Sequence, residues 1–447
     1  MDPTPSLMFR FFKDTSGWLP NYLRFRLNTP FPDLADQQTP LKFPPAREWL
    51  DQRLCPLVQG NGLFLGCPAV DEESRRRLRK LKFPEQQGGT LFLYLDTLGT
   101  LSFAEELLLH AQPGPYAERM TRWVLRLLRF HLPNREFRIL ESVPLDQLLA
   151  SNEVLQGALR LLEEGLLEQI PVAGYTFQDR QNLFVFPRLY AFLVWSDSIL
   201  RGVETPLAVI HATEAEVNED CLMAFAALIW SDEVLADVER EVLGKYLRQS
   251  GLPKARQAEL EKQLFEPMIP ENLQLRLEPP ILRRFLLEQL VLLALIDAQE
   301  ARQERALIAH IAQRLQVTQD TLEEIYASVG AFYAEYGEHF SFLRDNPAMR
   351  HLKDFSNDLI TRQVKKNLDH VMQEIRETRE LYDLLMKATT TNLSAAEKQK
   401  VQDQLLDIAK TIPALAIFVL PGGGLLLPIL IKILPFKLLP SSFHEEA

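Results

Sequence analysis

The sequence has few cysteines and no excess of positive charge, and both features exclude certain classes of protein. Three cysteines (Cys55, Cys67 and Cys221) among 447 residues are too few for a disulfide scaffold, which favours a reducing compartment. A net charge of −11 argues against a chain built to coat nucleic acid or anionic lipid, and we expect no nucleic-acid partner. The mean hydropathy of −0.10 excludes a polytopic membrane protein but leaves room for one membrane segment.

Common catalytic motifs are also missing from the sequence. It has no HExxH, GxGxxG, Walker A loop or CxxC pair, and its eight histidines are scattered. We therefore expect neither an enzyme nor a zinc site. The first twenty residues lack the basic start, apolar core and cleavage site of a secretory signal, so we expect the body to fold in the cytoplasm.

The hydrophobic pattern predicts a mainly α-helical, multi-domain chain, with helical spacing in stretches such as 101–131 and 153–170. Residues 174–186 (GYTFQDRQNLFVF) instead alternate around a polar centre and predict a small β-hairpin in the N-terminal half. Together with the acidic helix before it, this hairpin resembles part of a winged-helix module with a protein-contact or structural role. We predict four regions: a mixed α/β region at 1–206, a helical domain at 207–345, a long amphipathic helical region at 346–407 and an apolar segment at 408–447.

A basic run at 72–82 (EESRRRLRKLK) predicts a short helix. In an acidic chain such a run is usually a solvated helix face. A weak phosphate or partner site is the alternative, and the sequence alone leaves both interpretations open.

Two segments in the middle of the chain match at a constant offset of 65 residues (292 − 227 = 65). Each copy, at 227–252 and 292–317, has an apolar helix end, an acidic turn and a second amphipathic helix. We therefore predict a helical bundle made of two helical hairpins related by a pseudo-twofold axis. Acidic residues fall at matching places in the two copies: Asp232 with Asp297, and Glu239 with Glu304.

If the twofold relation holds, these four carboxylates converge and would offer oxygen ligands to Ca²⁺ or Mg²⁺. Alternatively, each Asp caps a helix and each Glu complements a helix dipole. The acidic pattern resembles the tellurite-resistance TerB-like family over about residues 207–330, with Glu233 and Ala298 where that family often has glycine. The resemblance implies a compact α-helical domain of membrane-associated stress and cation-linked systems.

Between residues 356 and 387, apolar residues recur at heptad spacing with charges between them, which predicts a long amphipathic helix. This helix either packs on its own chain or contacts a protein partner or a second copy. A break follows it. Ser394, with Glu397 three residues later, has the form of a capping box, so we predict that a new helix begins there.

Residues 411–431 carry no charged side chain, a length that can cross a bilayer. Pro421 and the three glycines after it interrupt the run, with Pro413 and Pro428 on either side, so a continuous helix is not expected. A broken span, a re-entrant apolar hairpin and a hairpin buried in its own domain remain open. We interpret the run as a lipid contact, with Lys432 reaching the headgroups.

Residues 393–443 resemble the membrane segment of the Letm family of mitochondrial inner-membrane proteins. The resemblance rests on Ser394 with Glu397, on Asp407, on the order of the prolines and on the LPSSF ending. Family members are linked to cation/proton exchange and ribosome binding, and bacterial relatives are loosely labelled as biofilm-associated. The segment residues that the resemblance implies are Pro413, Pro421, Gly422, Gly423, Gly424, Pro428, Lys432, Pro435 and Pro440.

Two departures from the family pattern limit what the resemblance implies. The acidic residue between the family's central prolines is Gly424 here, which leaves Asp407 as the candidate for an ion path. The family's ribosome-binding domain lies beyond this segment, so we expect it to be missing and ribosome binding not to carry over.

We therefore predict a non-enzymatic, bacterial-type scaffold or regulatory protein of envelope, cation or stress physiology. Its cytoplasmic body would be attached to the inner membrane by the C-terminal segment. Cation/proton transport and Ca²⁺ or Mg²⁺ sensing are the alternatives.

Overall fold

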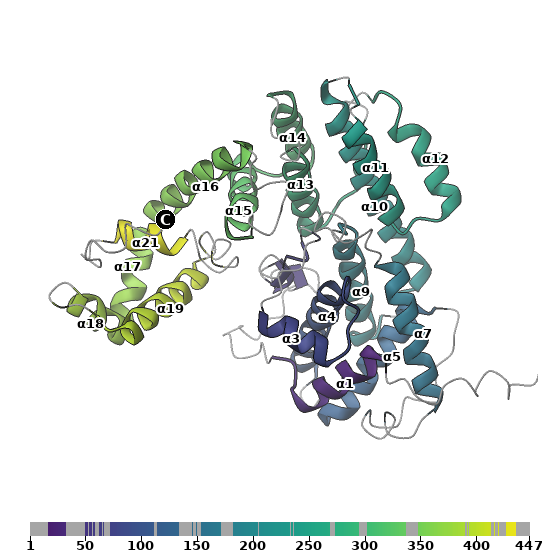
Figure 1. The fold of residues 1–447 in the computed structure, drawn as a ribbon, viewed down its shortest axis with the longest axis horizontal. Helices are drawn as coiled ribbons and strands as arrows, with labels where there is room; N and C mark the ends of the chain where they lie inside the picture. Colours follow the sequence, from purple (N-terminus) through teal and green to yellow (C-terminus); the bar gives the residue numbers. More distant parts are fainter. Residues whose placement is uncertain are drawn as a thin grey trace, which may run out of the picture. The chain divides into compact units, whose positions relative to one another are not determined.

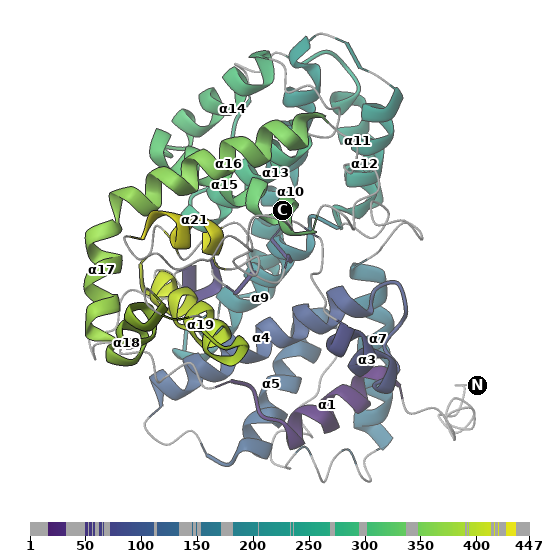
Figure 2. The same ribbon diagram turned by 60° about the vertical axis from the view of Figure 1, so that its left-hand side comes forward.

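The computed structural model describes the chain in stretches separated by gaps. They are residues 17–32, 50–51, 53–55, 57–58, 62–64, 66, 72–110, 114–133, 145, 149, 153–170, 182–203, 205–232, 234–235, 237–268, 273–294, 302–336, 347–388, 391, 393–412, 415, 419 and 426–434. Every regular element in these stretches is a helix, and they contain no strand (Figures 1 and 2). The predicted mainly α-helical class is confirmed.

The chain divides into two compact units. Unit 1 comprises Met1–Leu50, Val70–Tyr175 and Phe184–Glu214, and unit 2 comprises Asp51–Ala69, Thr176–Leu183 and Ala215–Ala447. The helices of unit 1 are α1 (Trp18–Asn28), α3 (Glu72–Lys80), α4 (Gly88–Leu109), α5 (Tyr116–His131), α7 (Glu153–Gln169) and α9 (Val185–Leu200). Helix α10 (Leu207–Ile229) begins in unit 1 and ends in unit 2.

Unit 2 continues from α10 through a short 3₁₀ helix into a series of α-helices. In chain order they are η3 (Trp230–Asp232), α11 (Asp237–Gln249), α12 (Lys254–Leu264), α13 (Pro280–Ala294), α14 (Arg302–Arg314), α15 (Gln319–Tyr336), α16 (Pro347–Lys366), α17 (Leu368–Glu377), α18 (Arg379–Ala388), α19 (Ala395–Thr411) and α21 (Leu426–Ile433). The predicted division of the chain into four regions stays a prediction.

Helices α4, α5 and α9 form the centre of unit 1. Helix α4 packs against α5, α9 and α3, and α7 packs against α1 and α5. Aromatic side chains fill the space between them. The ring of Trp123 on α5 is fully buried and lies 5.3 Å from that of Phe31 and 6.4 Å from that of Phe103 on α4. Such rings bury large apolar areas, which makes them the main source of stability in this core.

Buried charges also join α4 to its neighbours. Glu106 on α4 accepts hydrogen bonds from Arg119 Nε at 3.1 Å and Arg122 Nη2 at 2.7 Å, both on α5. The adjacent Glu105 has no such pair; it lies near Asp197 on α9, and Arg201 Nη2 is 4.0 Å away. Burial and the neighbouring Asp197 carboxyl both disfavour charge on Glu105, so its pKa is raised above the ordinary value.

We predict that Glu105→Gln stabilises the chain, and more so at higher pH. Because the folded-state pKa is raised, folded Glu105 keeps a proton that the unfolded chain loses above the ordinary glutamate pKa. Wild-type stability therefore falls as pH rises through that window, by at most about 1.4 kcal/mol per pH unit for this group. Urea unfolding of both proteins at about pH 6 and about pH 8 measures the difference. Equal gains at the two pH values, or the same behaviour in the exposed control Glu85→Gln, would contradict the assignment.

The two predicted repeat segments fold as helices with matching ends, but the pseudo-twofold bundle is not supported. Helices α10 and α13 end at Ile229 and Ala294, and α11 and α14 begin at Asp237 and Arg302. Helix α14 packs against its chain neighbours α13 and α15 and touches η3, while α11 packs against α12. The apolar face of α14 is therefore covered largely by neighbours in sequence rather than by a symmetric copy.

The predicted β-hairpin is wrong where the structure describes it. Val185 and Phe186 begin α9, and residues 174–181 lie outside the described residues. The sequence from Val185 to Leu200 is apolar on nearly all sides of the helix. A short run of apolar residues is found both in fully buried helices and in buried strands. The apolar residues at the start of α9 were therefore wrongly predicted to form a strand.

The helix predicted between residues 356 and 387 is divided into α16, α17 and α18. The first break lies at Asn367, whose side-chain Nδ2 donates to Gln363 O at 2.8 Å. The second lies at Thr378, where the backbone leaves the helical region. Both residue types have low helix propensity. The asparagine side chain forms hydrogen bonds with nearby backbone groups, and threonine is branched at Cβ.

Candidate functional site

The C-terminal helices of unit 2 enclose one apolar cluster, which we call the C-terminal core. Helices α16 to α19 and α21 contribute to it, as does α15. Its buried members are Ala327, Leu359, Ile360, Val364, Val371, Ile375, Leu381, Leu385, Val401, Leu405, Ile408, Ala409, Ile412, Leu415, Val419, Leu426, Leu430 and Leu434. Each fully buried Val, Leu or Ile contributes about 1.5–3 kcal/mol relative to exposure, so α19 and α21 depend on α16 to α18 for their burial.

Helix α19 begins with the predicted capping box, which is confirmed. Glu397 N donates to Ser394 Oγ at 3.3 Å, and Ser394 N donates to Glu397 Oε2 at 2.9 Å. Lys387, near the end of α18, donates from Nζ to Glu397 Oε1 at 2.6 Å. These hydrogen bonds, that of Lys387 first, lower the pKa of Glu397 to about 2 and tie the start of α19 to α18.

Ser394→Ala should destabilise the C-terminal core by about 1 kcal/mol, because the N-terminal N–H groups of α19 lose an acceptor. Thermal unfolding or local hydrogen exchange in α19 measures the loss. Ser394→Thr keeps the hydroxyl and serves as the matched control. An unchanged Ser394→Ala protein would show that the cap contributes nothing.

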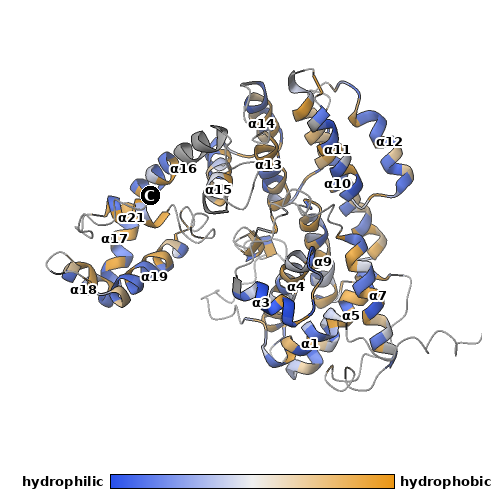
Figure 3. Cartoon of the chain, viewed as in Figure 1, coloured by the Kyte–Doolittle hydropathy of each residue, from blue (hydrophilic) through white to orange (hydrophobic). Residues whose placement is uncertain are grey.

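Helix α21 has one buried ridge and one exposed ridge. Leu426, Leu430 and Leu434 point into the C-terminal core at four-residue intervals. Pro428 and Lys432 lie on the exposed side of the helix. Between these ridges, half-buried apolar side chains form two flanks: Leu427 with Ile431 on one side, and Ile429 with Ile433 on the other. Apolar residues of α21 appear in orange in Figure 3.

The described residues of the apolar run before α21 include three that are packed against protein. Ile412, Leu415 and Val419 are all buried in the C-terminal core. None of the helices in the described stretches combines the length and the apolar character needed to cross a bilayer. The predicted apolar hairpin is not shown, because most of residues 408–447 lie outside the described residues. The segment residues that lie outside them are Pro413, Pro421, Gly422, Gly423, Gly424, Pro435 and Pro440.

Asp407, the candidate for an ion path, lies near the end of α19 with an exposed side chain. Its Oδ1 accepts a hydrogen bond from Lys410 Nζ at 2.8 Å, one helical turn further on. An exposed pair of this kind contributes at most about 1 kcal/mol to stability. The role of Asp407 in ion movement stays a prediction.

The acidic quartet is described only in part. Glu239 lies in the first turn of α11 and Glu304 in the first turn of α14; both are half-buried, and each already interacts within the chain. The side chain of Asp232 and the whole of Asp297 lie outside the described residues. Within the described stretches no group of three or more His, Cys, Asp or Glu side chains could hold a metal ion. The first-turn positions suit the helix-dipole interpretation.

Titration with Ca²⁺ or Mg²⁺ tests the cation hypothesis directly. If the quartet binds a cation, calorimetry should give binding heat that Asp232→Asn/Asp297→Asn abolishes, because two of the four oxygen donors lose their charge. Asp237→Asn, an exposed position on the same helix as Glu239, is the matched control. Absence of heat in the wild-type chain would end the hypothesis.

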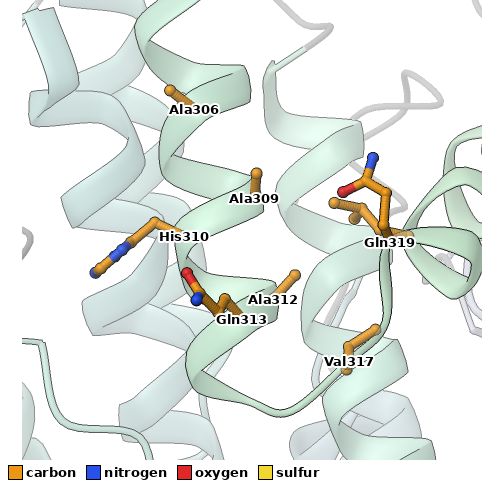
Figure 4. A pocket seen from close by; sticks show the side chains of 8 residues that line it. Ala306, Ala309, His310, Ala312, Gln313, Val317 and Gln319 are labelled. Carbon is orange, nitrogen blue, oxygen red and sulfur yellow. The ribbon is translucent and has the colours of Figure 1, made fainter.

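A surface groove of about 610 Å³ runs along α14 and the start of α15 (Figure 4). Alanines of α14 line one side of it, and Val317 and Gln319 lie beyond the turn that follows. Among the described residues that line it, His310 is the one ionisable side chain. The lining therefore offers little for acid–base chemistry.

Comparison with known proteins supports a relationship at the C-terminus. Residues 393–447 match the family described as LETM1-like, RBD, so this segment is related to the LETM1 family. No curated protein and no solved structure matches the chain. The comparisons lend no support to the TerB-like, bacterial or biofilm-associated expectations. The matched family description carries the label RBD and covers residues 393–447. It therefore does not support the expectation that the family's ribosome-binding domain lies beyond this segment and is missing.

The match begins at Leu393, directly before the capping residue Ser394. It therefore covers α19 and α21 but not the helices that bury them. Leu359 and Ile360 of α16 share the C-terminal core with this segment, and no pattern predicted from the sequence paired them with it. The four-residue spacing of Leu426, Leu430 and Leu434 is the signal that would have indicated a helix packed on protein.

Proposed function

We propose that this chain is a non-enzymatic scaffold or regulatory protein that contacts a membrane surface through α21. In this proposal the C-terminal core holds the buried ridge of α21, and the apolar flanks enter the interface between headgroups and acyl chains. The relationship of residues 393–447 to the LETM1 family supports a role for this segment. The single observation that carries the proposal is the apolar character of both flanks beside the exposed ridge.

The dimensions of α21 favour a contact along the surface. Eight residues make a helix about 12 Å long, well short of the roughly 30 Å of hydrocarbon in a bilayer. An interfacial helix needs apolar side chains on the lipid side and a basic residue able to reach the headgroups. Leu427 and Ile431 meet the first need, and Lys432 meets the second by extending its stem past them.

A scaffold or regulator is preferred to a transporter because of where Asp407 lies. An ion path through a membrane calls for a carboxylate shielded from bulk water. Asp407 is instead exposed and paired with Lys410. Self-association through residues 356–387 fits the proposal less well, because Val364, Val371, Ile375 and Leu385 are buried in the chain's own core.

Leu427→Gln/Ile431→Gln should weaken binding to vesicles of phosphatidylcholine, because these polar amides are costly to bury among acyl chains. The buried ridge stays intact, so the C-terminal core should remain folded. Sedimentation of the full-length chain with vesicles measures binding, and we expect a loss on the order of tenfold or more.

The matched control is Met372→Gln/Leu384→Gln, two half-buried positions that pack against the same core from α17 and α18. This pair should lower stability by a similar amount and leave vesicle binding unchanged. Equal vesicle binding by all three proteins, or none by the wild-type chain, would sink the proposal.

A further inference from the structure

A group of exposed basic side chains gathers where α1 and α3 meet. We call it the basic platform; its members are Arg24, Arg75, Arg76, Arg79, Lys80 and Lys82. Figure 3 shows α3 in the blue of hydrophilic residues. Helix α3 begins with two glutamates, Glu72 and Glu73, and Glu73 pairs with Arg77 at 2.9 Å; Glu85 is exposed beyond the helix. The platform thus carries a local positive excess on a chain whose net charge is −11.

The end of α3 is held in one conformation. Lys82 has a positive φ of 61°, with Lys82 N bonded to Arg79 O at 3.1 Å and Phe83 N to Leu78 O at 3.1 Å. This pair of bonds is the Schellman pattern that closes a helix. It sends the next residue, Phe83, into the core, where its ring lies 4.6 Å from that of Trp18.

Helix α1 is fastened to the same end of α3. Asn21 Nδ2 donates to Leu81 O at 3.3 Å, and Asn21 Oδ1 accepts from Arg24 Nη1 at 3.5 Å. The Arg77 guanidinium also lies 5.4 Å from the ring centroid of Phe25. The basic groups of the two helices therefore share one rigid surface within unit 1.

The helix dipole alone does not explain this distribution of charge. Basic residues in the last turn, such as Arg79 and Lys80, favour the negative end of the helix dipole. Arg75 and Arg76 lie earlier in the helix, where the dipole gives them no such advantage. Both of them, like Arg79, also make contacts within the chain, so the argument rests on accumulated charge and exposure.

We propose that the basic platform binds the anionic headgroups of a phospholipid surface. Four to eight clustered Lys and Arg residues on an amphipathic helix are typical of sites for anionic lipids. Binding to single-stranded nucleic acid commonly adds exposed aromatic side chains on which bases stack. The aromatic ring described beside the platform, that of Phe25, is half-buried and lies 5.0 Å from the Arg26 guanidinium and 5.4 Å from that of Arg77. The chain's overall negative charge also disfavours a long polyanion, whereas a lipid surface needs to meet only this face. The inference concerns a surface other than α21 and does not rest on the proposed function.

The test compares vesicles of phosphatidylcholine with and without phosphatidylserine, using the full-length chain. Arg75→Gln/Arg76→Gln/Arg79→Gln should lower the phosphatidylserine-dependent part of the binding. Each basic residue near an anionic surface strengthens binding about fivefold, so removing three should weaken it on the order of 100-fold. Binding that remains on pure phosphatidylcholine reports on α21, and the two proposals therefore fail separately.

Two variants act as controls for charge and for folding. Lys254→Gln/Lys262→Gln/Arg376→Gln removes the same charge from exposed positions in unit 2 and should bind as the wild-type chain does. Arg75→Lys/Arg76→Lys/Arg79→Lys keeps the charge and should retain binding. No dependence on phosphatidylserine, or equal loss in the first control, overturns the proposal. Platform-dependent binding to an RNA duplex without binding to vesicles also overturns it, in favour of a nucleic-acid site.

Discussion

The C-terminal region depends on one apolar core that two parts of the chain build together. Residues related to the LETM1 family supply α19, α21 and the buried side chains between them. Helices α16 to α18, which precede the matched segment, supply the opposing apolar surface. Neither part can bury its apolar residues alone, so the proposed membrane-contact surface of α21 is positioned by helices outside the recognised family segment.

This constraint changes how the uncharged run before Lys432 is understood. Taken alone, a run of this length indicates a membrane segment. Where the structure describes it, however, its side chains divide between a ridge buried in protein and flanks that are half exposed. A helix with this division can stay folded in water and still present apolar atoms to a bilayer surface. The proposed basic platform on unit 1 is a separate, charge-driven contact made through a rigid helix end.

Local features were predictable from the sequence, and features that need distant partners were not. Ser394 and Glu397 are three residues apart, so their capping box could be recognised directly. The apolar start of α9 was mistaken for a strand, because burial on all sides removes the helical period. Helix α16 packs against α21, and its core residues Leu359, Ile360 and Val364 lie more than sixty residues before Leu426, where no local pattern points to them. Convergence of the acidic quartet likewise depends on tertiary packing, and only Glu239 and Glu304 have described side chains.

The central claim is that α21 stays packed on the C-terminal core while its outer side meets a membrane surface. Hydrogen exchange measured along the full-length chain, with and without phosphatidylcholine vesicles, tests this most directly. The account predicts that amides of α21 gain protection when vesicles are added, while those of α17 and α18 keep the protection they have in solution. Exchange in α21 that is unaffected by vesicles, or loss of protection in α17 and α18 on binding, would contradict it.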